Sequence, residues 1–222
     1  MINDLKMGFR VIKYALSFKS SLFALIVFAI LGCAIEFMTP GTPLGGLYLA
    51  ISAIFVIQLV HSVCVSAMVQ TSPYKKKLQT VIPACMTLAA YLIANTIQLI
   101  VKFAAYHYFE KTEVELSNMI LISSIFMLVM TMYVAASFKA FWPATIIFFA
   151  VFLIVYPGLT IYMIMSDINE SALGMILPLW VAVLISYVMI IVSSVAVYLI
   201  SLALYKRDYS KTAFQAALDR AK

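Results

Sequence analysis

Long apolar runs, separated by short polar stretches, dominate this sequence. A helix that crosses a bilayer needs roughly 20 predominantly apolar residues. Six runs meet this condition, at about 20–39, 45–69, 81–109, 117–137, 141–163 and 177–204. Strand-like alternation is absent, and backbone polar groups inside lipid must be satisfied within the segment. The pattern therefore predicts an all-α polytopic membrane protein with six transmembrane helices.

The first 19 residues show a different pattern, that of an amphipathic helix. An apolar stripe at helical spacing is flanked by basic residues, and no short apolar region leads to a cleavage site. We expect this segment to lie in the headgroup plane and to lead into span one, either as a simple anchor or with a mechanical role. The stripe is Ile2, Leu5, Phe9, Ile12 and Leu16, and the flanking residues are Lys6, Arg10 and Lys13.

The region 157–180 departs from the simple pattern of spans. Pro157 and Gly158 interrupt the fifth run, and two short apolar pieces surround the acidic tip SDINES. This predicts a re-entrant hairpin between spans five and six that dips partly into the outer leaflet. The alternative is that spans five and six are merely long and tilted.

Composition agrees with a membrane protein. Hydrophobic residues make up 65% of the chain and charged residues 11%, whereas a soluble domain has roughly 25% charged residues. The pI near 9.2 does not indicate a nucleic-acid partner, because the basic residues form no single patch. The three cysteines include no Cys-x-x-Cys pair, so neither a disulfide framework nor a zinc site is predicted.

The charges predict the orientation of the spans. With six spans, one side carries both termini and the loops after spans two and four. That side holds every one of the 15 Lys and Arg residues except Lys102 and Lys111, whereas most acids, including Glu36, fall at the opposite ends, where we expect water to solvate them. Because Lys and Arg are enriched in cytoplasmic loops, we expect both termini in the cytoplasm of a cell membrane. The chain then divides into an interfacial helix (1–19), a membrane domain (20–204, with a cytoplasmic loop at 70–83) and a cytoplasmic tail (205–222).

The loop QTSPYKKKLQTVIP, residues 70–83, is more elaborate than a simple reversal requires. Ser72 and Pro73 read as a helix start, and Pro83 as a stop or kink, so a cytoplasmic helix of about two turns is predicted. Three lysines near its N-terminus oppose the helix dipole. Either attraction to anionic lipid and topology or docking to an acidic partner could offset that cost.

Polar residues recur inside two of the runs. In the third run they step by three or four residues and share one helical face, and the second run adds two more. Polar groups in hydrocarbon usually face the bundle interior or a water-filled path. The alternative is ordinary hydrogen bonding between helices, with His61 bonded rather than carrying protons and Lys102 reaching the outer surface. The candidate translocation path is Tyr91, Asn95, Gln98, Lys102, Gln58 and His61, and the same face includes Thr87 and Tyr106.

Catalytic and nucleotide-binding motifs are missing. The sequence has no GxxxxGK[ST], GxGxxG, HExxH or Gly-x-Ser-x-Gly pattern, and no span carries the paired acids expected of an ion-coupled pump. We therefore expect no enzyme and no bound cofactor or metal, and energy for transport would come from a partner.

The basic entry helix, the six spans with both ends inside, the short cytoplasmic helix after span two and the broken hairpin before span six resemble type-two permeases of ATP-binding-cassette exporters. The pieces SPYKKKLQTVIP and YKRD are similar to small bacterial members. The resemblance implies a permease that pairs with a second permease chain and docks two separate ATPase subunits, which bind the ATP. The family's coupling helix would place the ATPase contacts at Ser72, Pro73, Tyr74, Lys75, Lys76, Lys77, Gln79 and Thr80.

The implied function is export of an amphipathic or hydrophobic substrate, driven by ATP hydrolysis on the partner subunits. Two alternatives stay open. One is the substrate-binding membrane subunit of a vitamin importer, which would bind a small ligand tightly. The other is a membrane interaction or immunity protein that transports nothing and has no ATPase partner.

Overall fold

The computed structural model describes residues 2–15, 18–39, 41–64, 66–109, 113–168 and 177–210. No strand occurs in these residues, which confirms the all-α prediction for the described part of the chain. The helices are α1 (Ile2–Ile12), α2 (Phe18–Met38), α3 (Leu44–Cys64), α4 (Ala67–Gln70), α5 (Lys75–Phe109), α6 (Glu113–Ser137), α7 (Phe141–Ile168) and α8 (Leu179–Ala203).

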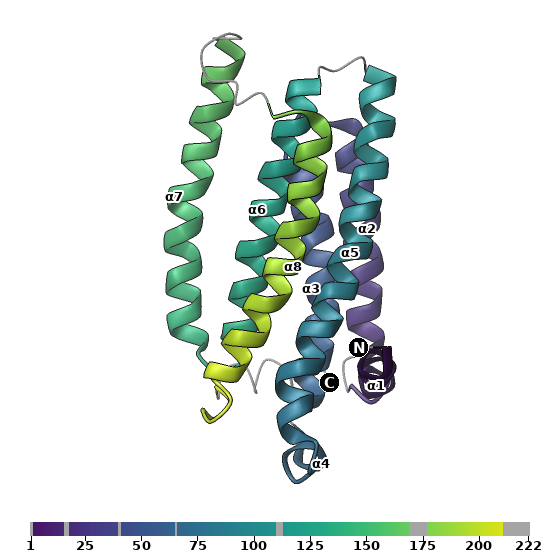
Figure 1. Ribbon diagram of the computed structural model, residues 1–222, viewed down its shortest axis with the longest axis vertical. Coiled ribbons are helices and arrows are strands. Elements are labelled where there is room, and N and C mark those ends of the chain that lie inside the picture. The colour runs from purple at the N-terminus through teal and green to yellow at the C-terminus, as the bar shows by residue number, and fades with distance from the viewer. Residues whose placement is uncertain are drawn as a thin grey trace.

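The long helices run up and down one bundle, and α1 and α4 lie at its lower end in Figure 1. Helix α3 lies in the interior, packed against α2, α5 and α6, and α8 packs against α5 and α6. Helix α7 packs chiefly against α6 and stands at the left edge of Figure 1. The first helix and the end of α8 therefore share the lower end with the loop between α3 and α5.

Five helices, α2, α3, α5, α6 and α8, are long and apolar enough to cross a membrane. Their outer faces are apolar, and so is that of α7: Phe23, Ile100, Ile147 and Leu184 are each 40% or more exposed. A soluble protein rarely exposes apolar surface on this scale. The chain is therefore a helical multi-pass membrane protein.

The two tryptophans lie at opposite ends of this apolar surface. Trp142 is in the first turn of α7, at the lower end, and Trp180 is in the first turn of α8, at the upper end. Their side chains are 65% and 66% exposed. Exposed tryptophans gather where the membrane meets water, so the pair indicates where the two interfaces cross the bundle.

Helix α1 lies across the bundle, and Figure 1 shows it almost end-on. Gly8 packs closely against α5, where an added Cβ would lie 2.6 Å from the Met86 sulfur. This contact sets the buried side as Gly8, Ile12 and Ala15, whereas Phe9 stays 56% exposed. The predicted stripe included Phe9, because spacing alone does not reveal that a glycine makes this close contact.

The separate two-turn helix predicted within 70–83 does not form. Helix α5 begins at Lys75 and continues through Pro83 to Phe109 as a single 35-residue helix. A proline inside a helix removes one backbone hydrogen bond, and membrane helices tolerate this where neighbouring groups compensate. Here the carbonyl that loses its donor is that of Gln79, and one turn beyond the proline the Thr87 hydroxyl donates to the Pro83 carbonyl at 2.7 Å.

The interruption predicted at Pro157 and Gly158 also does not break the helix. Helix α7 continues through both residues to Ile168. The segment 169–176, which contains the rest of the predicted hairpin, lies outside the described residues, as do most of the C-terminal tail and the side chains of Ile2 and Leu16.

Candidate functional site

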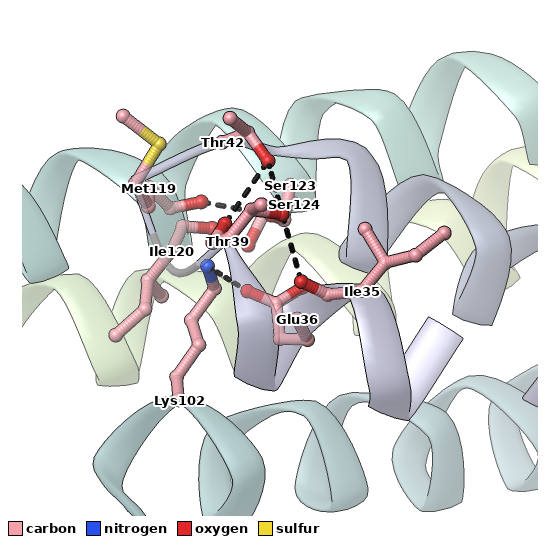
Figure 2. A network of polar contacts seen from close by, with 9 residues as sticks. All are labelled: Ile35, Glu36, Thr39, Thr42, Lys102, Met119, Ile120, Ser123 and Ser124. Atoms are coloured by element: carbon pink, nitrogen blue, oxygen red, sulfur yellow. Dashed lines mark hydrogen bonds and ion pairs between the residues drawn. The ribbon is translucent and has the colours of Figure 1, made fainter. Parts of the chain in front are cut away.

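A buried ion pair joins α2 to α5 near the upper end of the bundle. Glu36 lies in the last turn of α2, and Lys102 lies about two turns before the end of α5. The Lys102 ammonium contacts the Glu36 carboxylate (Figure 2), and both side chains are 0% exposed. Burying a single charge costs several kcal/mol, about 3–5 if its partner is removed. Each side chain can therefore stay charged in the interior only while the other neutralises it.

The ion pair has few other partners. Beyond it, neither the Glu36 carboxylate oxygens nor the Lys102 ammonium has a hydrogen bond of ordinary geometry to the described residues. The Gly46 amide lies toward the carboxylate without reaching that geometry. The side-chain carbonyl oxygen of Gln98, one turn below Lys102, is also buried without a partner. Three adjacent polar side chains thus keep unused hydrogen-bonding capacity in a dry interior.

Two glycines at the start of α3 make room for this arrangement. A Cβ on Gly45 would lie 2.6 Å from the Glu36 Cα and would collide with its carboxylate. A Cβ on Gly46 would lie 2.5 Å from the Gln98 amide nitrogen and 2.6 Å from the Ser123 hydroxyl. Four helices therefore converge here. We call Glu36, Gly45, Gly46, Gln98, Lys102 and Ser123 the ion-pair cluster.

The predicted polar face of α5 points into the bundle. Tyr91, Asn95, Gln98 and Lys102 are all buried, each at most 3% exposed. The Asn95 amide donates to the Ser186 hydroxyl of α8 at 3.1 Å. The structure therefore brings the α5 candidates together on one inward face.

Sequence reasoning missed the ion pair. The expectation that water solvates Glu36 is wrong, and so is the alternative that Lys102 reaches the outer surface, because the two charges neutralise each other inside the bundle. The sequence did contain a signal for this pair. Glu36 lies inside the first apolar run and Lys102 inside the third, and both lie near the ends of these runs that are predicted to be on the same side of the membrane.

The two candidates on α3 lie elsewhere. His61 is buried in the lower half of the bundle, and its ring stacks on Phe138 with centroids 4.5 Å apart. Its Nε2 atom has no hydrogen-bond partner among the described residues. Gln58 is one turn away on the same helix and is partly buried.

A second polar cluster closes the lower end. The Lys139 ammonium donates to the Gln79 side-chain oxygen at 3.2 Å and to the Tyr205 carbonyl at 2.9 Å, and it lies 4.9 Å from the ring centre of Tyr209. Burial lowers the pKa of Lys139, and the nearby charge of Lys75 lowers it further. This basal cluster connects α5, the turn after α6 and the segment after α8.

The exposed residues of the 70–83 loop form a small surface at the lowest point of Figure 1. We call Pro73–Lys77 the basic turn. Tyr74 is 58% exposed, and its backbone N–H donates to the Ser72 hydroxyl at 3.1 Å. Gln79 and Thr80 were also predicted partner contacts, but they are only 3% and 2% exposed and are not part of this surface.

The basic turn is tied to the first helix. The Lys77 ammonium contacts the Asp4 carboxylate at 2.6 Å, and this pair is exposed to water at the lower end. The Lys77–Asp4 and Lys102–Glu36 pairs therefore both end on α5, one toward each end of that helix.

Comparison of the chain with protein-family models, with curated proteins and with solved structures found no match.

Proposed function

We propose that this chain is the permease subunit of an ATP-binding-cassette exporter and that separate ATPase subunits dock on its basic turn. One observation carries the proposal: a single helix, α5, connects the exposed turn to the buried polar face. At a rise of 1.5 Å per residue, Lys75 and Lys102 lie about 40 Å apart along its axis. A permease without a nucleotide-binding motif needs such a connection to couple substrate movement to ATP hydrolysis on a partner subunit.

A displacement at the basic turn would reach the ion-pair cluster mechanically. Helix α5 is continuous from Lys75 to Phe109, and packed helices transmit displacements between distant sites. A shift of α5 would carry Asn95 past α8, Lys102 past α2 and Gln98 past the start of α3, because each side chain faces that neighbour. These residues are the proposed path for an amphipathic or hydrophobic substrate.

The distribution of charge supports the proposed partner. Lys75, Lys76 and Lys77 open α5, where the helix dipole disfavours cations by about 0.3–1 kcal/mol each. Asp4 compensates Lys77, whereas Lys76 is exposed on the same surface. An acidic surface on an ATPase subunit would offset the remaining repulsion.

The proposed topology has six spans, with α7 as the sixth helix beside the five that are long and apolar enough. The lower end, which carries α1, the basic turn, Lys139 and the end of α8, would face the cytoplasm of a cell membrane. Helix α1 would lie in the headgroup layer with Phe9 and Tyr14 toward lipid. A second permease chain would complete the transporter.

Purification from the native membrane in mild detergent tests the docking. We expect ATP-hydrolysing activity, carried by separate nucleotide-binding subunits, to co-purify with the chain. Combining Tyr74→Ala with Lys76→Ala should reduce that activity at least about tenfold, which corresponds to 1.4 kcal/mol of docking free energy.

The matched control is Tyr108→Ala. Tyr108 is 72% exposed, like Tyr74, but lies at the other end of α5. Equal loss in both variants, or full retention of the ATPase in the Tyr74 and Lys76 variant, would remove the basic turn as the docking surface.

A further inference from the structure

Helix α2 is held to the bundle in an unusual way. Its buried residues are Ser21, Gly32 and Glu36, so none of its described large apolar side chains is buried. Phe23 and Ile30 are 71% and 64% exposed on its outer face. Apolar contact gives little net attraction between helices in lipid, where close packing and polar contacts act instead. In the upper half of α2, the buried contacts are therefore the packing of Gly32 and the Glu36 ion pair.

Gly32 supplies the packing contact. An added Cβ there would lie 2.8 Å from the Leu49 side chain and 3.1 Å from the Gly45 carbonyl oxygen. This contact is with α3, whereas the ion pair is with α5. Contact between α2 and α5 at this end thus combines the buried ion pair with an exposed ring contact of Phe37 with Tyr108 and Phe109.

We propose that the Glu36–Lys102 ion pair is a latch. While it is closed, it holds the upper end of α2 against α5 and keeps water away from Gln98 and Ser123. When α5 shifts, the pair separates, the upper end of α2 moves outward, and the uncovered polar groups bind water or the polar part of a permeating molecule. The use of the latch in transport rests on the proposed function, but its opening does not.

The chemistry of the cluster favours a latch over a fixed support. A buried ion pair can often be replaced by apolar side chains with no loss of stability, so stability alone does not require it. The Gln98 carbonyl and the Lys102 ammonium have hydrogen-bonding capacity that no described residue uses. A polar molecule that enters when the pair separates can use this capacity, which lowers the cost of opening.

In this proposal the two ion pairs on α5 open one after the other. The exposed Asp4–Lys77 pair lies on the docking surface, so a partner that binds Lys77 competes with Asp4 and loosens α1. Helix α1 precedes α2 directly, so the restraint on the lower end of α2 would then weaken, whereas the packing of Gly32 and the Glu36–Lys102 pair would still hold its upper half.

Cysteine labelling tests the latch without any partner. Ser123→Cys places a thiol beside Gly46 at a position that is 1% exposed. Membrane vesicles that contain this chain would be treated with N-ethylmaleimide, and the labelled sites would be identified by mass spectrometry. With the ion pair intact, we expect slow labelling at position 123. Adding Lys102→Gln should increase its rate at least about tenfold.

Two controls separate opening from unfolding. The native Cys64 is fully buried at the lower end and should stay unlabelled throughout. Reversing the charges with Glu36→Lys and Lys102→Glu should return the labelling of position 123 toward its original rate.

Unchanged labelling of position 123 in the Lys102→Gln chain would overturn the latch, and so would a parallel rise at Cys64. Because no ATPase is present, these results are independent of docking. If labelling shows that the latch opens but no ATPase co-purifies with the chain, the latch proposal would remain and the proposed function would be wrong.

Discussion

Two glycines, which lack a Cβ atom, make the close packing of the ion-pair cluster possible. Gly45 and Gly46 let the first turn of α3 lie directly against Glu36, Gln98 and Ser123. A methyl group at either position would have to displace atoms that are already in contact, and such overpacking costs about 1–3 kcal/mol.

Alanine at these two positions should therefore destabilise the protein. We expect Gly45→Ala and Gly46→Ala each to lower the melting temperature in a fixed detergent, through an unfavourable change of about 1–3 kcal/mol. The control is Gly158→Ala in α7, where an added Cβ meets nothing within 4 Å and helix propensity alone favours alanine by about 1 kcal/mol. Equal effects at all three positions would contradict the packing described here.

The sequence could identify the polar residues but not their partners. The spacing of Tyr91, Asn95, Gln98 and Lys102 was enough to place them on one face. Neither the pairing of Lys102 with Glu36 nor the contact of His61 with Phe138 follows from spacing, because each joins helices far apart in the chain. Gln79 and Thr80 were misplaced for a related reason: their burial depends on where the turn after α6 and the segment after α8 pack.

At the scale of the helix, Pro83 marks a weak point in α5. It cannot donate to the Gln79 carbonyl, and it lies just above the basic turn, beside the basal cluster that holds the Gln79 side chain. Bending of α5 under load would concentrate there.

Pro83→Ala should stiffen this part of the helix. The restored N–H would donate to the Gln79 carbonyl, and the higher helix propensity of alanine would contribute up to roughly 3 kcal/mol. Hydrogen exchange followed by mass spectrometry should show slower exchange between residues 79 and 87, with no change in α6. Faster exchange in that segment would mean that Pro83 supports the helix through packing.

The contact between α1 and α5 should respond to salt and to strong acid. The Lys77 ammonium donates to the Asp4 carboxylate and holds the pKa of Asp4 below its ordinary value of 3.8. A lowered pKa means that this stabilisation is complete above about pH 5 and is lost as the pH falls through the pKa of the folded state. Salt should weaken the pair at neutral pH, because exposed charges are screened.

Hydrogen exchange of α1 measures this contact. We expect constant protection from about pH 5 to 8 after correction for intrinsic rates, and reduced protection in about 1 M salt. Asp4→Asn should remove the salt dependence, and a salt dependence that survives in this variant would show that other charges hold α1.

For the whole molecule, the six apolar runs correspond to α2, α3, α5, α6, α7 and α8, and the runs predicted their order. The largest error in a boundary is at α5, which begins at Lys75 rather than near 81 because lysines and a proline conceal a continuing helix from a hydropathy pattern. The crossing position of α1 arises from packing at Gly8, which no pattern of apolar residues specifies.

Thiol labelling of intact cells tests the orientation of the bundle. Lys76→Cys, in the basic turn, should be protected from a membrane-impermeant reagent, whereas Glu113→Cys, exposed in the first turn of α6, should react. Permeabilised cells should label at both positions. Reaction of position 76 from outside would place the basic turn beyond the reach of any cytoplasmic ATPase.

The two tryptophans also fix how far the molecule stands out of the lipid. In the proposed topology, Trp142 lies at one headgroup layer and Trp180 at the other, and the basic turn then projects beyond the membrane on the side of Trp142. A bilayer with longer acyl chains would submerge more of that projection. Under the proposed function, membrane thickness would therefore partly set how far the chain reaches toward an ATPase subunit.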